Sequence, residues 1–497
     1  MSNSKYVMAI DQGTTSCRAL IFNENCEVVD IAQKEFTQFF PNEGWVEHDA
    51  NEIWDTQITV IKEVLEKSGI GAEQITSIGI TNQRETTLIW DKETGEPIAK
   101  AIVWQDRRTS DYCDSIRDQW KDTIKSKTGL IIDAYFSGSK IKWLLDNTDG
   151  ARELADQGKL LFGTMETWLI WKLTGGKSHV TDMSNASRTM IFNIVDQSWD
   201  SELMGVLTVP QSVLPEVKEN MDDFGITDAS VFGAEVPING AAGDQQSALF
   251  GQMCLEPGTA KNTYGTGCFL VTNTGDKIVS SENQMLSTIG WKVNGQITYA
   301  LEGSVFVAGA IVQWLRDSLG LLSDAAESEG MATSVDNNGG VYVVPALTGL
   351  GAPHWDQNAR GTIVGLTRGS NKNHIVRAAL EGIAYQVNDV VKAMEADLGM
   401  KMKELKVDGG ATSNQFLMKF QAAISNTPVV VAANQESTAL GAAMLAGLKA
   451  GVWSGFDDLR SKMSEGKTYS SDELDIDRDR LLDGWNQAVK RSLSTTA

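Results

Sequence analysis

The first 40 residues place apolar and polar positions in the pattern that β-strands require. Two apolar runs, YVMAI (6–10) and CRALIF (17–22), flank the polar segment DQGTTS (11–16), and CEVVDIAQKEF (26–36) follows a second turn. Short apolar runs bounded by Gly, Asn and Asp predict strands joined by tight turns. We therefore expect residues 6–40 to form a three-stranded meander.

The next segment, DANEIWDTQITVIKEVLEKSG (49–69), has the period of an amphipathic helix. Its apolar side chains recur every three or four residues, which places them on one face. Asp49 is suited to cap the N-terminus, Glu52 would complete a capping box, and Gly69 would end the helix.

Later segments predict further strands and a repeat of the opening pattern. ITSIGIT (75–81) is typical of a buried strand, and residues 86–104 predict a hairpin that turns at 93–95. Residues 258–275 again give a strand, a turn of Gly and Thr, and a strand. Residues 405–425 give a strand, a GGA turn and a helix with an apolar stripe.

This repetition predicts a duplicated α/β domain with a cleft between the two copies. The chain has 497 residues, well above the size at which one hydrophobic core stops growing, so at least two domains are expected. We expect the N-terminal domain to span 1–252 and the C-terminal domain 253–497. No low-complexity linker separates them, so the halves should pack closely and hinge.

Composition excludes several classes of function. The net charge of −22 argues against nucleic acid or an anionic membrane as a major partner. No window approaches 18 consecutive apolar residues, so no membrane insertion is expected, and the N-terminus lacks the pattern of a signal peptide. Five scattered cysteines with no CxxC spacing favour a reduced, cytoplasmic protein over a zinc or disulfide framework.

The turn DQGTTS holds a carboxylate, a glycine and three hydroxyls. Such a turn can direct backbone N–H groups and hydroxyls at one anion, and Asp11 could hold Mg²⁺, which prefers hard oxygen ligands. Taken alone, the segment could equally be a simple hairpin turn. The second turn, NTYGTGC (262–268), favours the phosphate-binding interpretation, because two such turns in corresponding places form a clamp.

Two other segments carry candidate chemistry, and each has a structural alternative. AAGDQQSALFG (241–251) places Asp244 where a helix begins, so this carboxylate could be no more than a helix N-cap. NQRETT (82–87) places Arg84 and Glu85 directly after a buried strand, where α/β proteins bind ligands. Adjacent Arg and Glu residues are, however, usually a solvated surface pair.

Two familiar phosphate-binding scaffolds are excluded. TGGKS (174–178) contains GKS, but Trp171 stands where a P-loop requires its first glycine. The HRD and DFG motifs of protein kinases are absent.

Together these segments resemble the FGGY carbohydrate kinases, and within that family the branch that acts on glycerol. The resemblance covers essentially the whole chain. YFSGSKIKWLLDN (135–147) and GTIVGLTRGSNKNHIVRAALE (361–381) match the two family signatures. DQGTTS, NQRETT, AGDQQ, YGTGCF and DGGA with its following asparagine complete the match, and NQRETT is the segment that separates this branch from sugar kinases.

The resemblance implies a fold and a reaction. The fold would be the α/β actin-like ATPase fold, with two ribonuclease-H-like domains and a nucleotide cleft between them. The reaction would be the ATP-dependent phosphorylation of glycerol to sn-glycerol 3-phosphate by in-line transfer, with Asp244 as the general base. The partners would be glycerol and ATP with Mg²⁺, in a homodimer or homotetramer.

The resemblance also implies which residues form the two binding sites. The residues that would bind the nucleotide are Thr14, Thr15, Ser16, Arg18, Thr266, Gly309, Gln313, Gly410 and Asn414, with Asp11 near the magnesium. The residues that would bind glycerol are Arg84, Glu85, Trp104, Tyr135, Asp244, Gln245 and Phe269.

Other functions stay open at this point. One alternative is an FGGY kinase for another polyol, a pentulose or a sugar acid. Another is a non-catalytic protein of the actin fold, such as a filament former or a nucleotide-gated chaperone, although these lack a carboxylate base beside a polyol pocket.

The resemblance predicts that this chain lacks two regulatory devices of bacterial relatives. Some are inhibited by fructose 1,6-bisphosphate, held by a Gly-Arg loop ahead of AGDQQ, and Glu235 aligns with that arginine. Others are activated by phosphorylation of a histidine in the same loop, where Ser230 aligns. We therefore predict control mainly by substrate and product levels.

Overall fold

The computed structural model describes residues 5–464 and 466–494, and its first large sheet has the strand order β13-β5-β1-β2-β3. Strands β1, β2 and β3 form the predicted antiparallel meander, whereas β5 and β13 run parallel to β1. The bounds are β1 (Tyr6–Gln12), β2 (Ser16–Phe22), β3 (Val28–Glu35), β5 (Ile75–Asn82) and β13 (Ile238–Gly243).

The second large sheet repeats this order within seven strands, β16-β17-β15-β14-β20-β21-β22. Here β17-β15-β14 are antiparallel, and β14, β20 and β21 are parallel, as in β3-β2-β1-β5-β13. The duplication predicted from the two turns is therefore confirmed. The bounds are β14 (Thr259–Tyr264), β15 (Cys268–Gly275), β16 (Leu286–Val293), β17 (Gln296–Val305), β20 (Glu404–Asp408), β21 (Val429–Val431) and β22 (Lys467–Tyr469).

Helix α1 (Ala50–Ser68) confirms the predicted helix and both of its ends. The Asp49 carboxylate accepts hydrogen bonds from the Asn51 and Glu52 amides, and Gly69 ends the helix with φ +68°. The predicted capping box is wrong, because the Glu52 carboxylate accepts from the amide and hydroxyl of Thr37 and so ties the helix to the end of the meander.

The hairpin predicted for residues 86–104 is confirmed only in part. The chain does reverse at 92–95, and the Ile98 amide donates to the Ile89 carbonyl. However, β6 (Leu88–Asp91) takes β8 (Leu160–Gly163) as its antiparallel neighbour, because this strand forms part of a second core with α2 to α4.

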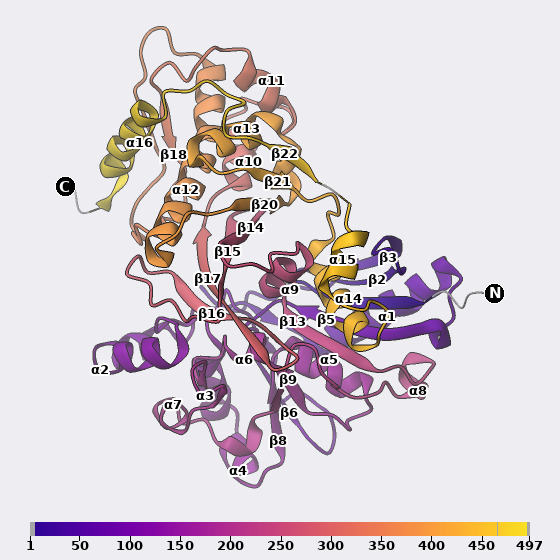
Figure 1. Cartoon of the computed structure of the whole chain (residues 1–497). Coiled ribbons are helices and arrows are strands. Elements are labelled where there is room, and N and C mark those ends of the chain that lie inside the picture. Colours follow the sequence, from indigo (N-terminus) through magenta and orange to yellow (C-terminus); the bar gives the residue numbers. More distant parts are fainter. Residues whose placement is uncertain (1–4, 465, 495–497) are drawn as a thin grey trace.

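Helix α14 (Ser437–Lys449) packs on the first sheet although it follows the second sheet in sequence. Figure 1 shows α14 and α15 (Phe456–Lys462) beside β2 and β5. Leu440 and Met444 share a core cluster with Val7 and Leu20. Residues 437–462 therefore cross back and cover one face of the first sheet, before the chain returns to the second sheet with β22.

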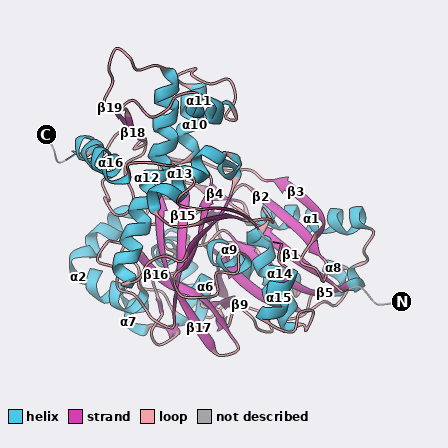
Figure 2. Ribbon diagram, turned by 45° about the horizontal axis from the view of Figure 1, so that its top comes forward, coloured by secondary structure: helices cyan, strands magenta, loops and turns pink. Residues whose placement is uncertain are grey.

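The remaining helices form the layers around both sheets. Helices α1 and α5 cover the other face of the first sheet, and α12 and α13 pack on the second sheet (Figure 2). The other helices are α2 (Ser110–Thr128), α3 (Ser137–Asn147), α4 (Ala151–Asp156), α5 (Met165–Leu173), α6 (Met183–Ala186), α7 (Ser201–Val206), α8 (Ala229–Phe232), α9 (Asp244–Gly251), α10 (Gly309–Asp317), α11 (Glu327–Thr333), α12 (Lys372–Leu398), α13 (Gln415–Ser425) and α16 (Arg478–Ser492). The small strands are β4 (Glu47–His48), β7 (Ala101–Ile102), β9 (Val180–Asp182), β10 (Phe192–Asn193), β11 (Ser198–Trp199), β12 (Glu216–Lys218), β18 (Tyr342–Val344) and β19 (Thr362–Val364).

Candidate active site

The first predicted phosphate turn joins β1 to β2 and is closed by a hydrogen bond from the Gly13 amide to the Ser16 carbonyl, 2.9 Å. Asp11 and Arg18 lie opposite each other in the register of the two strands, and their side chains form an ion pair. The other end of the Arg18 guanidinium contacts Glu436 at 2.5 Å. Thr15 is exposed at the tip of the turn, whereas Ser16 is buried.

The second predicted phosphate turn joins β14 to β15 in the same way. Thr266 is exposed at its tip, and its carbonyl accepts from the amides of Ala308 and Ala310 at the start of α10. The Gly309 amide donates to the Gly265 carbonyl at 2.9 Å. The turn and the N-terminus of α10 are thereby fixed together.

The other predicted nucleotide residues lie on the second half as well. Gln313 is exposed on α10, and Gly410 is exposed in the short 3₁₀ turn Gly410–Ser413. Asn414 caps α13 by accepting from the Leu417 amide. Gly409 brings the 3₁₀ turn to the second phosphate turn, because its φ of +93° and its contact with the Tyr264 carbonyl leave no room for a Cβ.

Arg84 and Glu85 follow β5 and are both buried, with 3% and 1% of their surfaces exposed. A solvated surface pair is therefore excluded. The Arg84 guanidinium places Nε 3.2 Å from the Asp244 carboxylate and 3.9 Å from the Glu85 carboxylate. Its Nη2 donates to the Tyr135 hydroxyl at 3.4 Å.

Glu85 has a left-handed backbone, with φ +61°, which is unfavourable for a residue with a Cβ. Three side chains from outside this turn stabilise it, in addition to the hydroxyl of Thr87, which donates to its carbonyl at 2.9 Å. Ser137 Oγ and Lys140 Nζ donate to its carbonyl at 3.1 and 3.3 Å, and Arg188 Nε donates to its carboxylate at 2.6 Å. Burial lowers the pKa of Lys140 to about 8. These hydrogen bonds fix both the backbone and the carboxylate of Glu85 in a single orientation.

Asp244 begins α9 but does not cap it. Gly243 occupies the N-cap position without a side-chain hydrogen bond, and the Asp244 carboxylate instead pairs with Arg84. About a third of the Asp244 side chain (34%) is exposed. Burial raises the pKa of Asp244, against the opposing effect of Arg84, and a raised pKa makes a carboxylate a better proton acceptor.

An aromatic wall connects the predicted substrate residues to the first phosphate turn. Trp104 meets Tyr135 edge to face, with ring centroids 5.8 Å apart. Its indole Nε1 donates to the Thr14 hydroxyl at 3.0 Å. Phe269 lies on the other sheet, half-buried in β15 opposite Thr263, and its predicted contact with the substrate stays a prediction.

Gln245 follows Asp244 on α9 and links the two halves. Its side-chain oxygen accepts a hydrogen bond from Lys261 of β14. Because lysine can only donate, the Gln245 oxygen is occupied, and its NH₂ group is the part available to a ligand.

Sequence reasoning missed three buried charges around the site, Lys261, Arg188 and Glu302. Arg188 and Lys261 have no exposed surface, and Glu302 has 4%. Glu302 contacts Arg84 and Arg188. One signal in the sequence could have indicated them. These charged residues stand beside apolar strand or helix segments, where an ionised side chain requires a buried partner.

Family models match both halves of the chain. The N-terminal domain of the FGGY family of carbohydrate kinases matches residues 6–251, and its C-terminal domain matches residues 260–450. The chain belongs to the FGGY family of carbohydrate kinases.

Relatives within the FGGY family span nearly the full chain. It is 59% identical to a glycerol kinase of Petrotoga mobilis and 57% identical to one of Carboxydothermus hydrogenoformans, each over 98% of both chains. The crystal structure of Plasmodium falciparum glycerol kinase with ADP superposes with a TM-score of 0.94 at 38% identity, covering 99% of this chain and 98% of the other. The expected actin-like architecture is thereby confirmed.

The residues that the structure describes contain neither a metal-binding cluster nor a membrane-spanning helix. No group of three or more His, Cys, Asp or Glu side chains within 5–464 and 466–494 is arranged to hold a metal ion. Over the same residues, no helix is long and apolar enough to cross a membrane.

Proposed function

We propose that this chain is a glycerol kinase, which transfers the γ-phosphoryl group of ATP to glycerol and forms sn-glycerol 3-phosphate. The observation that carries the proposal is the position of Arg84, whose guanidinium lies beside Glu85, Tyr135 and Asp244. The names of the relatives and of the ADP-bound structural neighbour point to the same reaction.

The side chains around Arg84 suit a small triol. Arg84 and the Gln245 NH₂ offer donors, Glu85 and Asp244 offer acceptors, and the Tyr135 hydroxyl can do either. Trp104 provides an apolar wall for the carbon chain, and we propose Phe269 as the opposite wall. Fixed donors and acceptors of this kind reject ligands that leave them unpaired.

Asp244 is the group that accepts the proton of the attacking hydroxyl. As that oxygen forms its bond to the γ-phosphorus, the bond from the γ-phosphorus to the bridging oxygen breaks and ADP leaves. Because positioning and charge neutralisation dominate such transfers, the main task of the chain is to hold both substrates in line.

The two phosphate turns would hold the nucleotide between the halves. Thr14, Thr15, Ser16 and Arg18 supply hydroxyls and a cation from the first turn, and Thr266 contributes from the second. The other nucleotide contacts proposed on the second half are Gly309, Gln313, Gly410 and Asn414. Asp11 offers the hard carboxylate oxygen that suits Mg²⁺, and the ion, when bound, neutralises phosphate charge.

We also propose a cytoplasmic location, a domain division and an oligomeric state for this chain. All five cysteines are buried and free, which fits the reducing cytoplasm. We propose a division into domains 1–252 and 253–497, and a homodimer or homotetramer.

A coupled assay of ADP release tests the function directly. The chain should consume ATP steadily only when glycerol is present, and the product should be sn-glycerol 3-phosphate. A filament former or a nucleotide-gated chaperone would hydrolyse ATP without polyol. Thermal shifts with glycerol, xylulose and gluconate test the substrate, and a larger shift with either sugar than with glycerol would contradict the proposal.

A further inference from the structure

Four buried side chains form a closed ring of ion pairs beside the polyol site. Arg84 Nη1 lies 2.5 Å from Glu302 Oε2, and Arg188 Nη2 lies 2.9 Å from Glu302 Oε1. Arg188 Nε lies 2.6 Å from Glu85 Oε1, and Arg84 Nε closes the ring at 3.9 Å from the same oxygen. All four side chains are at most 4% exposed.

One member of the ring comes from the second half of the molecule. Arg84 and Glu85 follow β5, and Arg188 follows α6, whereas Glu302 lies on β17. The backbone of Glu302 is fixed on both sides, because it pairs with Val271 of β15 and Leu286 of β16. A strand that is fixed within the second sheet thus positions the Glu302 carboxylate beside Arg84.

Glu302 uses one oxygen for each arginine. Held through Nη1, the Arg84 guanidinium turns Nε and Nη2 toward Asp244 and Tyr135. Held through Nη2, Arg188 turns Nε toward Glu85. Without the carboxylate, two guanidinium groups would face each other in a medium of low dielectric constant, where like charges repel strongly.

The ionisation of Glu302 agrees with this arrangement. Burial alone would raise its pKa, but Arg188 and Arg84 lower the pKa of Glu302 to about 2. The carboxylate is therefore charged throughout the range in which the enzyme would work.

We propose that Glu302 is a positioning residue of the polyol site, contributed by the second half of the chain. It orients Arg84 directly and Glu85 through Arg188, so the affinity for the triol depends on how the two sheets are placed against each other. This inference rests on the proposed function, and it adds a residue that would not itself touch glycerol.

The test compares two substitutions at Glu302 with a matched control. Glu302→Gln keeps the shape and removes the charge. It should raise the KM for glycerol by about 10- to 100-fold, the range set by one or two charged hydrogen bonds, and change the KM for ATP less than about threefold. Glu302→Asp keeps the charge but withdraws it by one methylene, so it should give a smaller rise.

Glu381→Gln is the control. Glu381 is a buried carboxylate of the second half that pairs with Arg377 and Asn338 on and near α12. Its substitution should lower the melting temperature while leaving the KM for glycerol unchanged, as expected of an ion pair with only a structural role.

The outcomes separate the two proposals. If the wild-type chain shows no glycerol-dependent ADP release, the proposed function fails. If the wild-type chain is active but Glu302→Gln keeps its KM for glycerol, or raises both KM values equally, the positioning role is wrong. Should Glu302→Gln fail to fold, an unchanged KM for glycerol in Glu302→Asp overturns the role in the same way.

Discussion

At the scale of single residues, Glu85 shows that the candidate site is preorganised. Its φ of +61° is unfavourable, and Ser137, Lys140 and Arg188 hold it there. Unfavourable backbone conformations persist where the surroundings determine them, and they cluster at functional sites. Because the carboxylate is already oriented, a triol would not have to order it, which favours binding.

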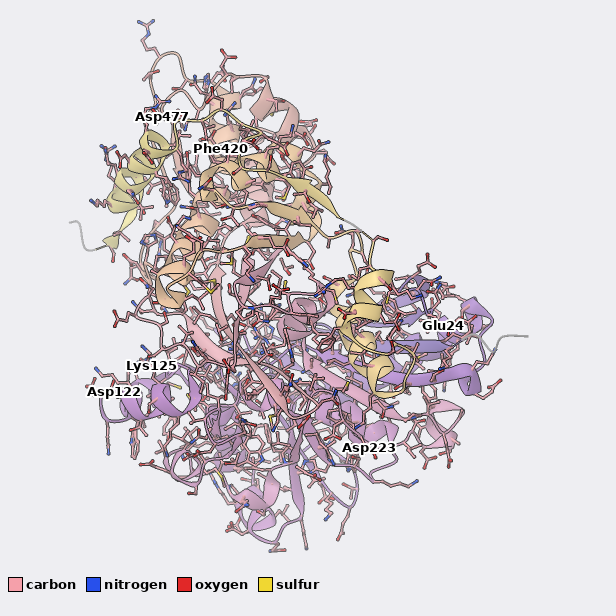
Figure 3. All side chains as sticks on the ribbon, viewed as in Figure 1. Glu24, Asp122, Lys125, Asp223, Phe420 and Asp477 are labelled. Carbon is pink, nitrogen blue, oxygen red and sulfur yellow. The ribbon has the colours of Figure 1, made fainter. Side chains whose placement is uncertain are left out.

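Asp244→Asn tests the general base at this scale. The amide keeps the shape of the side chain but cannot accept the hydroxyl proton, so kcat should fall by about 10²–10⁴ and the KM for glycerol much less. The measurement is steady-state ADP release, with the exposed Asp122→Asn on α2 (Figure 3) as the control. A near-normal kcat would remove Asp244 from this role.

Glu235 carries the prediction about regulation. It lines a cavity of about 580 Å³ whose other charged lining residues are Glu216, Asp223, Lys177 and Lys218. A doubly phosphorylated sugar requires an excess of cationic donors, which this lining does not offer. We expect no inhibition by millimolar fructose 1,6-bisphosphate in the coupled assay. Saturable inhibition would contradict the prediction.

At the scale of elements, α14 positions α9, the helix that begins with Asp244. It lies against β5 and α9 with almost no space between them, since a Cβ on Gly79 would meet the Ala442 carbonyl, and one on Gly441 would meet the Ser247 carbonyl. Ser247 Oγ also donates to the Thr438 carbonyl at 2.7 Å. Helix α9 begins with Asp244, so the placement of α14 sets the position of the proposed base.

Gly441→Ala tests this contact. The added methyl group must push α14 from α9, and overpacking of this kind costs about 1–3 kcal/mol. We expect a lower melting temperature together with a lower kcat. Gly205→Ala in α7 is the matched control, since a Cβ there meets open space; it should be neutral or slightly stabilising. Equal behaviour of the two variants would show that α14 does not constrain α9.

At the scale of the whole molecule, the two halves are joined by contacts of different kinds. Lys125 on α2, labelled in Figure 3, donates to the Ser281 carbonyl of the second half at 2.8 Å. Arg18 pairs with Glu436, and Arg84 with Glu302. Of these contacts, the pair of Arg84 with Glu302 includes a residue that we propose binds the substrate, so stability and substrate binding would be physically linked there.

The dependence of stability on pH provides a test at this scale. Burial, followed by the nearby Asp182, raises the pKa of Glu166 from 4.5 to about 7. The folded state therefore holds a proton that the unfolded state releases, so this stabilisation is complete below pH 4.5 and is lost as the pH rises to about 7.

Glu166→Gln replaces the protonated acid with a neutral amide. The free energy of unfolding of the variant should rise relative to that of the wild type between pH 5 and 8, by up to about 1.4 kcal/mol per pH unit. Melting temperatures measured over this pH range should show the same trend. The difference between the two proteins reports on Glu166 together with its neighbour Asp182, because the other carboxyl groups titrate alike in both. Parallel curves would show that Glu166 titrates normally.

The sequence by itself determined the parts of this protein that depend on neighbouring residues. The meander, the caps of α1 and both phosphate turns follow from patterns within a few residues, because hairpins and helix ends are stabilised by local hydrogen bonds. The duplicated architecture followed from the recurrence of one such turn. The family motifs predicted most of the residues that we propose for the site.

Only the tertiary structure decided which distant charges meet. Arg84 and Glu302 are 218 positions apart, and nothing local to TYALEGSV marks Glu302 as the partner of an arginine after β5. The same holds for the crossing of α14 to the first sheet and for the strand that pairs with β6. Buried ions and close helix crossings are selected by what packing places opposite them, since an ionised group removed from water requires a partner that only the folded chain can supply.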